Sequence, residues 1–292
     1  MIGLPRNGYS VLTFTLLLGA CAMQNAPPAE PKQASTPTPD PVPVLVTSSK
    51  QDQAPAAEAS GPALASPIAQ AVAAPDRAAD DRALDPQRKP AELLRFFGIA
   101  PGQHVAELGA GGGYTAELLA RIVGPSGKVY GQNSKFILER FAQAPWSARL
   151  QKSIMQNVVR LDTEFDAPFP PEVRQLDGVL LIMFYHDTVW LKVDRMRMNQ
   201  AIHAALKPGG VYGVVDHSAA KGAGVSAAET LHRIESSVVI DEVTRAGFDL
   251  QETANFLENP ADTRDWNASP RSAGERRGTS DRFVLRFVKR AP

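Results

Sequence analysis

Cysteine is almost absent from this chain of 292 residues, which contains only Cys21. A single cysteine cannot form an intramolecular disulfide, and it leaves the rest of the chain without thiols for catalysis or metal binding. An excess of charge of one sign is also lacking, because 31 basic and 31 acidic residues give a formal net charge of zero. The chain therefore has no general basic field that would attract nucleic acid, and no nucleic-acid partner is predicted.

The first apolar run, residues 11–20, is too short to span a bilayer. It follows a single basic residue, Arg6, and is typical of a secretory signal peptide. Leu18-Gly19-Ala20-Cys21 resembles a bacterial lipobox, in which the cysteine is acylated after cleavage. The resemblance implies a lipoprotein signal peptide at 1–20, a lipid anchor on Cys21 and, because Ala22 follows, an outer-membrane address facing the periplasm. A short uncleaved anchor is the alternative.

Large side chains are missing from the next segment, which has eleven prolines between residues 22 and 85 and no aromatic residue before Phe96. Such a composition cannot bury enough apolar surface to offset the entropy of ordering the chain. We therefore predict a disordered Pro/Ala-rich tether at 21–85 and one globular domain at 86–292, which should fold without the tether.

Glycine is concentrated in one turn, within Val105-Ala106-Glu107-Leu108-Gly109-Ala110-Gly111-Gly112-Gly113-Tyr114. Glycines let the backbone take positive φ angles and approach a ligand closely, and the amides that open the next helix point toward that ligand. The dinucleotide pattern G-x-G-x-x-G would need its third glycine at position 114, where this chain has tyrosine. The turn therefore predicts a nucleotide-cofactor site that matches NAD or FAD imperfectly.

Apolar runs recur through the domain at 103–108, 127–131, 156–161, 177–184, 210–215, 248–256 and 282–289. Helical patterns separate the first five runs, and this alternation predicts a parallel sheet with helices on both faces. The last two runs have no clear helix between them and are predicted to form an antiparallel pair. The expected fold class is α/β: a Rossmann-like, seven-stranded, mainly parallel sheet.

An acid two residues before G-x-G-x-G resembles the first motif of class I S-adenosylmethionine (SAM) dependent methyltransferases. Other phrases bring the chain close to predicted methyltransferases exported as bacterial lipoproteins, namely Val129-Tyr-Gly-Gln-Asn133, Tyr185-His-Asp187, Val215-Asp-His217, Leu231-His-Arg233 and Gly278-Thr-Ser-Asp281. The resemblance implies an enzyme with SAM as cofactor. It would move a methyl group by direct displacement to an unidentified small-molecule acceptor.

The resemblance also implies which residues hold SAM. Glu107 would hold the methionine ammonium, with an acid that only caps the turn as the alternative, and the turn residues Gly109, Ala110, Gly111, Gly113 and Tyr114 would border the cofactor. At the end of the second strand the family usually has an acid for the ribose hydroxyls, where this chain has Gln132 and Asn133. Amides can still bond to ribose, but without a charge-assisted bond. Asp162 is the expected adenine contact, with Asp166 in reserve.

Histidines and acids follow the fourth and fifth predicted strands, where His186, Asp187 and His217 are the candidate catalytic residues. Histidine titrates near neutral pH, so one ring could take the proton of an acceptor while the other orients it. A helix-entry role for His186 and a backbone-bonded loop role for His217 are the alternatives. His232 could close over the pocket, but is interpreted as a packing or capping residue.

No compact metal motif such as H-E-x-x-H is present, so no metal site is predicted, although His186, Asp187, Asp216 and His217 would suit a divalent ion if they converged. SAM is made in the cytoplasm, and an exported enzyme would need it supplied across a membrane. The alternative function is therefore a non-catalytic, methyltransferase-like envelope lipoprotein that binds a nucleotide-like or other small ligand. The sequence leaves the oligomeric state undetermined.

Overall fold

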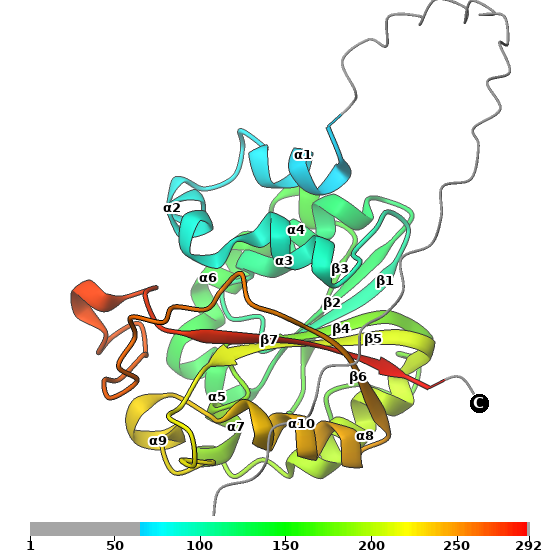
Figure 1. The fold of residues 1–292 in the computed structure, drawn as a ribbon. Helices are drawn as coiled ribbons and strands as arrows, with labels where there is room; N and C mark the ends of the chain where they lie inside the picture. The colour runs from blue at the N-terminus through cyan, green and yellow to red at the C-terminus, as the bar shows by residue number, and fades with distance from the viewer. Residues whose placement is uncertain (1–64, 291–292) are drawn as a thin grey trace, which may run out of the picture. The chain divides into compact units, whose positions relative to one another are not determined.

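The computed structural model describes residues 65–290, which are organised around a seven-stranded sheet (Figure 1). The strand order is β3-β2-β1-β4-β5-β7-β6. The strands are β1 (His104–Leu108), β2 (Lys128–Asn133), β3 (Val158–Asp162), β4 (Leu176–Ile182), β5 (Leu206–His217), β6 (Phe248–Ala254) and β7 (Arg282–Lys289). The first five run parallel, whereas β7 is antiparallel to both β5 and β6. The predicted fold class is confirmed.

Helices cover both faces of the sheet, with α1, α3 and α4 on one side and α8 and α10 on the other (Figure 1). The α-helices are α1 (Pro67–Ala73), α2 (Ala79–Arg88), α3 (Pro90–Phe96), α4 (Tyr114–Val123), α5 (Lys135–Ile137), α6 (Gln143–Leu150), α7 (Asp187–Trp190), α8 (Arg195–Ala205), α9 (Ala228–Leu231) and α10 (Ser236–Arg245). Short π or 3₁₀ turns occupy Leu138–Ala142, Ser153–Met155 and Gly274–Arg276. None of the described helices is long and apolar enough to cross a bilayer.

The order of the strands reverses between β1 and β4, the two neighbours at the middle of the sheet. In open parallel sheets, ligands bind outside the carboxyl ends of the strands at such a reversal. The glycine turn leaves β1 at this place. Met183, which follows β4, has a φ of 54°, in the left-handed region that a side chain rarely adopts. Backbone strain of this kind is concentrated at functional sites.

The folded domain begins about twenty residues earlier than predicted, because residues 67–88 form α1 and α2 instead of a tether. Ile68 and Ala71 of α1 lie in the hydrophobic core. Buried or partly buried ion pairs hold the segment, including Arg77 with Asp85 at 2.6 Å, and further pairs join Asp81 to Arg149 and Asp76 to Arg121. The predicted boundary at residue 85 is wrong because small apolar residues and charges replace the large side chains that usually indicate a packed segment. The signal peptide, Cys21 and residues 22–64 lie outside the described residues.

Removal of α1 and most of α2 should destabilise the domain, contrary to the expectation from composition. A chain that starts at residue 86 loses Asp81 and Asp85, and it leaves the Tyr114 hydroxyl, which donates to Asp85 at 2.6 Å, without this acceptor. We expect its melting midpoint to lie roughly 5 to 10 °C below that of a chain starting at residue 62, a shift that corresponds to a few kcal/mol in a domain of this size. Scanning calorimetry of the two chains measures it, and equal midpoints would contradict the packing role of these helices.

Candidate active site

The loop that joins β1 to α4 has positive φ at three glycines: 65° at Gly109, 55° at Gly111 and 83° at Gly113. A Cβ atom at Gly111 would meet nothing closer than 4.0 Å, so the loop borders free space there. A Cβ at Gly113 would instead overlap the ring of Trp146. Gly111 therefore offers the surface that a ligand can approach, whereas Gly113 is required by packing.

Glu107 lies near the end of β1 as a buried carboxylic acid, and its Oε2 atom has no hydrogen-bond partner. Burial raises the pKa of Glu107 to about 8, although Thr115, the charge of Arg88 and the Ala116 amide lower it in part. A buried carboxyl with an unsatisfied oxygen is unfavourable unless a partner binds it. The site thus presents an acid that lacks a cation.

Gln132 and Asn133 brace the glycine loop. The Gly109 amide donates to Gln132 Oε1 at 3.1 Å and the Gly111 amide donates to Asn133 Oδ1 at 2.8 Å. The side-chain nitrogens donate in turn to the Thr163 and Gly111 carbonyl oxygens. Both side chains are buried. The structure thus uses them to hold the loop, and a contact with ribose would require Asn133 to release Gly111.

The other predicted cofactor residues are distributed around this loop. The Ala110 amide donates to the Gln132 carbonyl at 2.9 Å. Tyr114 turns toward α2, where its hydroxyl bonds to Asp85 and the guanidinium of Arg88 lies 4.4 Å from the centre of its ring. Asp162 is paired with Asn133 in the register of β2 and β3, and its carboxylate accepts from Arg160 at 2.7 Å. Asp162 therefore lies next to Asn133 at the end of β3, and its role as the adenine contact stays a prediction. Asp166 pairs with Arg197 instead.

A cavity beside Tyr114 is lined mostly by apolar side chains, and its lining also includes Thr115, Met183 and two arginines, Arg88 and Arg282. Neither arginine forms an ion pair with an acid of residues 65–290. Burial and, to a smaller extent, the charge of Arg88 lower the pKa of Arg282 to about 10. Two desolvated cations at one cavity favour an anionic group such as a carboxylate. Sequence reasoning missed this pair because Arg88 and Arg282 lie far apart in the sequence and no local pattern connects them.

His186 and Asp216 form the centre of the second half of the site. The His186 ring bonds through Nδ1 to Asp216 Oδ1 at 2.7 Å, and the His186 amide donates to Asp216 Oδ2 at 2.7 Å. Burial alone would lower the pKa of His186, but the carboxylates of Asp216 and Asp187 outweigh it and raise the pKa to about 10. Without another ligand, His186 is therefore a cation at neutral pH and is poorly suited to act as a base.

His217 has the opposite character. Its Nδ1 lies 2.7 Å from the Ser280 hydroxyl, and its amide donates to Asp216 Oδ1 at 2.7 Å. Burial and the nearby charges of His186, Arg282 and Arg233 hold the pKa of His217 well below its usual range. His217 is thus a neutral imidazole with its ring centre 5.7 Å from that of His186. Of the two predicted histidines, it is the better proton acceptor.

Asp187 brings a third histidine into the site. Its Oδ1 lies 3.2 Å from His186 Nε2, 3.1 Å from His232 Nδ1 and 2.8 Å from Trp190 Nε1, which donates to it. Burial raises the pKa of Asp187, but the bonds from these groups outweigh it and hold the pKa far below its usual range. The structure therefore joins His186, Asp187 and His217 as predicted, and it adds His232. A sequence separation of 46 residues between His186 and His232 gave no local signal of this contact.

The loop after β6 contacts α9, where Asn267 Nδ2 donates to the Thr230 carbonyl oxygen at 2.7 Å. Arg233, next to His232, is fully buried and pairs with Asp262 at 2.7 Å. Its guanidinium also lies 4.6 Å from the centre of the Trp266 ring. A buried ion pair of this kind fixes the relative positions of the two segments, because separating it would leave a charge unpaired. The loop thus holds His232 in place over His186.

Comparison with known proteins identifies the class to which this fold belongs. Solved structures of similar fold include a SAM-dependent methyltransferase from Aquifex aeolicus, with 17% identity, a TM-score of 0.50, and coverage of 72% of this chain and 96% of that chain. An arsenic(III) S-adenosylmethionine methyltransferase from Chlamydomonas reinhardtii has 17% identity, a TM-score of 0.50, and coverage of 77% and 73%. The cyclase SpnF has 16% identity, a TM-score of 0.51, and coverage of 73% and 82%.

The sequence itself matches a family model over a shorter range. Residues 85–160 match the model of protein-L-isoaspartate(D-aspartate) O-methyltransferase. The match includes Glu107, the glycine loop and Asn133, and it ends before the cluster around His186. The predicted methyltransferase fold is therefore confirmed, and the comparisons indicate SAM as the cofactor. The comparisons do not identify the methyl acceptor.

Proposed function

We propose that this protein is a SAM-dependent methyltransferase that acts on a small-molecule acceptor. Glu107 carries the proposal: it is a buried acid at the head of the glycine loop with an oxygen that no described group satisfies. The ammonium group of SAM supplies the missing cation, and a buried charge pair with good hydrogen bonds is far more stable than one unpaired charge. Free space at Gly111 supports the same placement of the cofactor.

The cavity arginines support the orientation of the cofactor. Arg88 and Arg282 lie on the side of Tyr114 and Thr115, and Thr115 also contacts Glu107. SAM carries an ammonium and a carboxylate on the same carbon, so an acid and a pair of arginines near the start of one helix match both charges. When bound, SAM supplies an electrophilic methyl group on its sulfonium sulfur.

The histidines serve the acceptor. Displacement at a methyl group needs an acceptor held in line and, for a hydroxyl, removal of its proton. His217 is neutral and takes that proton, while Asp216 fixes the backbone of both histidines and the ring of His186. The fold alone does not fix the reaction, since the same fold occurs in the cyclase SpnF. The cluster of His186, Asp187, Asp216 and His217 is thus the part of the site that determines which reaction this protein catalyses.

We also propose that the enzyme works at the cell envelope, anchored by a lipid on Cys21. The lipobox-like stretch before Cys21 supports this address. The Pro/Ala-rich segment that follows it would keep the domain away from the membrane surface.

Calorimetric titration of the purified chain with SAM tests the proposed function. We expect one SAM per chain and the release of about one proton at pH 7, because the pairing with an ammonium returns the pKa of Glu107 from about 8 toward its ordinary value. Titrations in two buffers with different ionisation enthalpies measure the proton release. No binding at millimolar SAM by a folded chain would favour a non-catalytic envelope protein instead.

A further inference from the structure

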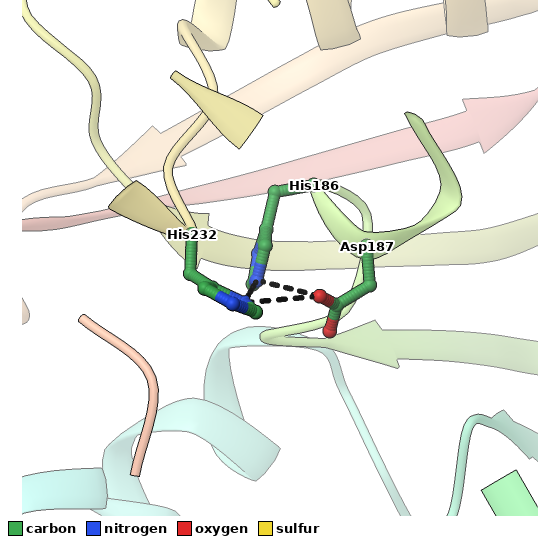
Figure 2. Close-up of side chains that lie close together, drawn as sticks. All are labelled: His186, Asp187 and His232. Atoms are coloured by element: carbon green, nitrogen blue, oxygen red, sulfur yellow. Dashed lines mark hydrogen bonds and ion pairs between the residues drawn. The ribbon is translucent and has the colours of Figure 1, made fainter. Parts of the chain in front are cut away.

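Three metal-ligand atoms lie unusually close to one another at the carboxyl ends of β4 and α9. His186 Nε2 is 3.2 Å from His232 Nδ1 and 3.2 Å from Asp187 Oδ1, and the last two atoms are 3.1 Å apart. Figure 2 shows the two rings and the carboxylate pointing toward one another. We propose that His186, Asp187 and His232 bind one divalent first-row transition-metal ion, of the kind for which Zn²⁺ is a probe.

The spacing fits a common ion. A triangle with edges near 3.2 Å has its corners about 1.8 Å from its centre, so an ion about 1 Å out of the plane lies about 2.1 Å from all three atoms, as Zn²⁺ does from its nitrogen and oxygen ligands. All three ligands then lie on one side of the ion. Two histidines and one carboxylate on one face leave the remaining positions open, as in catalytic metal sites.

A second layer of hydrogen bonds orients two of the ligands. His186 bonds to Asp216 through Nδ1, which directs the lone pair of Nε2 toward the cluster. Histidine ligands usually make such a bond to a carboxylate through the other ring nitrogen. Trp190 Nε1 donates to the ligand atom of Asp187 at 2.8 Å and fixes that carboxylate in the same way. The pair of Asp216 and His186 thus has the carboxylate–histidine arrangement that commonly supports a metal ligand.

The charges of the cluster also call for a cation. Asp187 and Asp216 are two carboxylates with little or no exposure, at 14% and 0% of their side chains. The neighbouring arginine, Arg233, is already paired with Asp262, so the positive charge that faces these carboxylates is a proton on the His186 ring, which a metal ion would displace. A divalent ion would balance both carboxylates while both histidine rings remain neutral. One shared proton leaves two acceptor atoms of the triangle facing each other: with the proton on His186 Nε2, these are His232 Nδ1 and Asp187 Oδ1, 3.1 Å apart.

The site is accessible, since a quarter of the His232 side chain is exposed. An ion there would keep open positions, and the His217 ring lies nearby, with its centre 5.7 Å from that of His186. If the proposed methyltransferase function holds, an oxygen of the acceptor is the natural occupant of such a position. Binding of the ion does not depend on the methyltransferase function, because Glu107 and the residues of the glycine loop are not among its ligands.

Metal titration of the full chain after treatment with EDTA tests the proposal. We expect one Zn²⁺ per chain by calorimetry, and visible absorption bands on addition of Co²⁺. His232→Ala and Asp187→Asn should each weaken binding at least tenfold and remove the Co²⁺ bands, because each takes away one ligand. His104→Ala is the matched control: this exposed histidine starts β1 at the opposite end of the sheet and should leave binding unchanged.

Two results would overturn the metal site. One is a folded wild-type chain that binds no Zn²⁺ at 1 mM, roughly a thousandfold above the micromolar range of a weak protein site. The other is equal binding by the wild type and by His232→Ala, with folding verified by circular dichroism. SAM is titrated into the same metal-free protein, so binding of SAM without binding of Zn²⁺ would retain the proposed function and reject the metal.

Discussion

Gly111→Val should abolish SAM binding while the domain remains folded. The Cβ position at Gly111 is in free space, 4.0 Å from the nearest atom, and this is the space in which a cofactor approaches the loop. Saturating the wild type at a hundred times its Kd should raise its free energy of unfolding by about 2.7 kcal/mol. We expect Gly111→Val to show none of this stabilisation and to bind SAM at least a hundredfold more weakly.

The substitution also strains the backbone, since φ at Gly111 is 55°. A β-branched residue in this region costs about 1 to 2 kcal/mol. Gly209→Val separates the two effects: Gly209 has a φ of 75° and nothing within 4 Å of its Cβ position, but it lies at the opposite end of the sheet. Both variants should melt earlier than the wild type, and only Gly111→Val should lose its response to SAM. An unchanged response in Gly111→Val would place the cofactor elsewhere.

Glu107→Gln should stabilise the free protein at pH 8 and weaken its binding of SAM. The unfolded carboxyl ionises near pH 4.3, whereas burial raises the pKa of the folded one to about 8. Between these values the folded state holds one more proton, so its stability falls as the pH rises, by about 1.4 kcal/mol per unit from this group. Glutamine removes this loss. We expect the variant to be more stable by a few kcal/mol at pH 8 and to show little gain at pH 5.

Urea denaturation at the two pH values measures the effect on stability, and calorimetry measures the loss of affinity, which we expect to be about 10- to 100-fold for a buried charge pair. Glu117→Gln is the matched control. Glu117 is also buried, but it pairs with Arg149 and Lys152, and hydrogen bonds from these groups hold its pKa below the usual range despite burial. That substitution should destabilise the protein at pH 8. Equal signs for the two variants would mean that Glu107 is already satisfied in the free protein.

The strands were predictable because each is an apolar run with its own local signal. All seven predicted runs overlap a strand, and 282–289 matches β7 residue for residue. The helices α1 and α2 were not predictable from composition, because alanine and proline occur both in tethers and at the starts of short helices. The feature that distinguishes this segment from a tether is its ion pairs, Asp76 with Arg121 of α4 and Asp81 with Arg149 of α6. These pairs form only after the chain has folded.

The site shows the same division. Glu107, the glycine loop and the histidines after β4 and β5 could be named because strand ends meet at one edge of a parallel sheet. The orientation of Asn133 could not be predicted, because an amide at that position can bond equally well to a ligand or to the loop beside it. His232 enters the site because Arg233 is tied to Asp262 across a long loop. The sequence shows which residue types are present, but the ion pair between Arg233 and Asp262 is visible only in the folded structure.

The placement of β7 constrains how the polypeptide can acquire its structure. This strand follows all the others in sequence, yet it lies between β5 and β6 and is the only strand that β6 pairs with among the described residues. Until β7 has left the ribosome, β6 lacks the partner it has in the described fold and β5 has one bare edge. Unpaired edges bind other chains readily. A nascent chain of this protein therefore depends on the release of β7, or on a chaperone, to close its sheet.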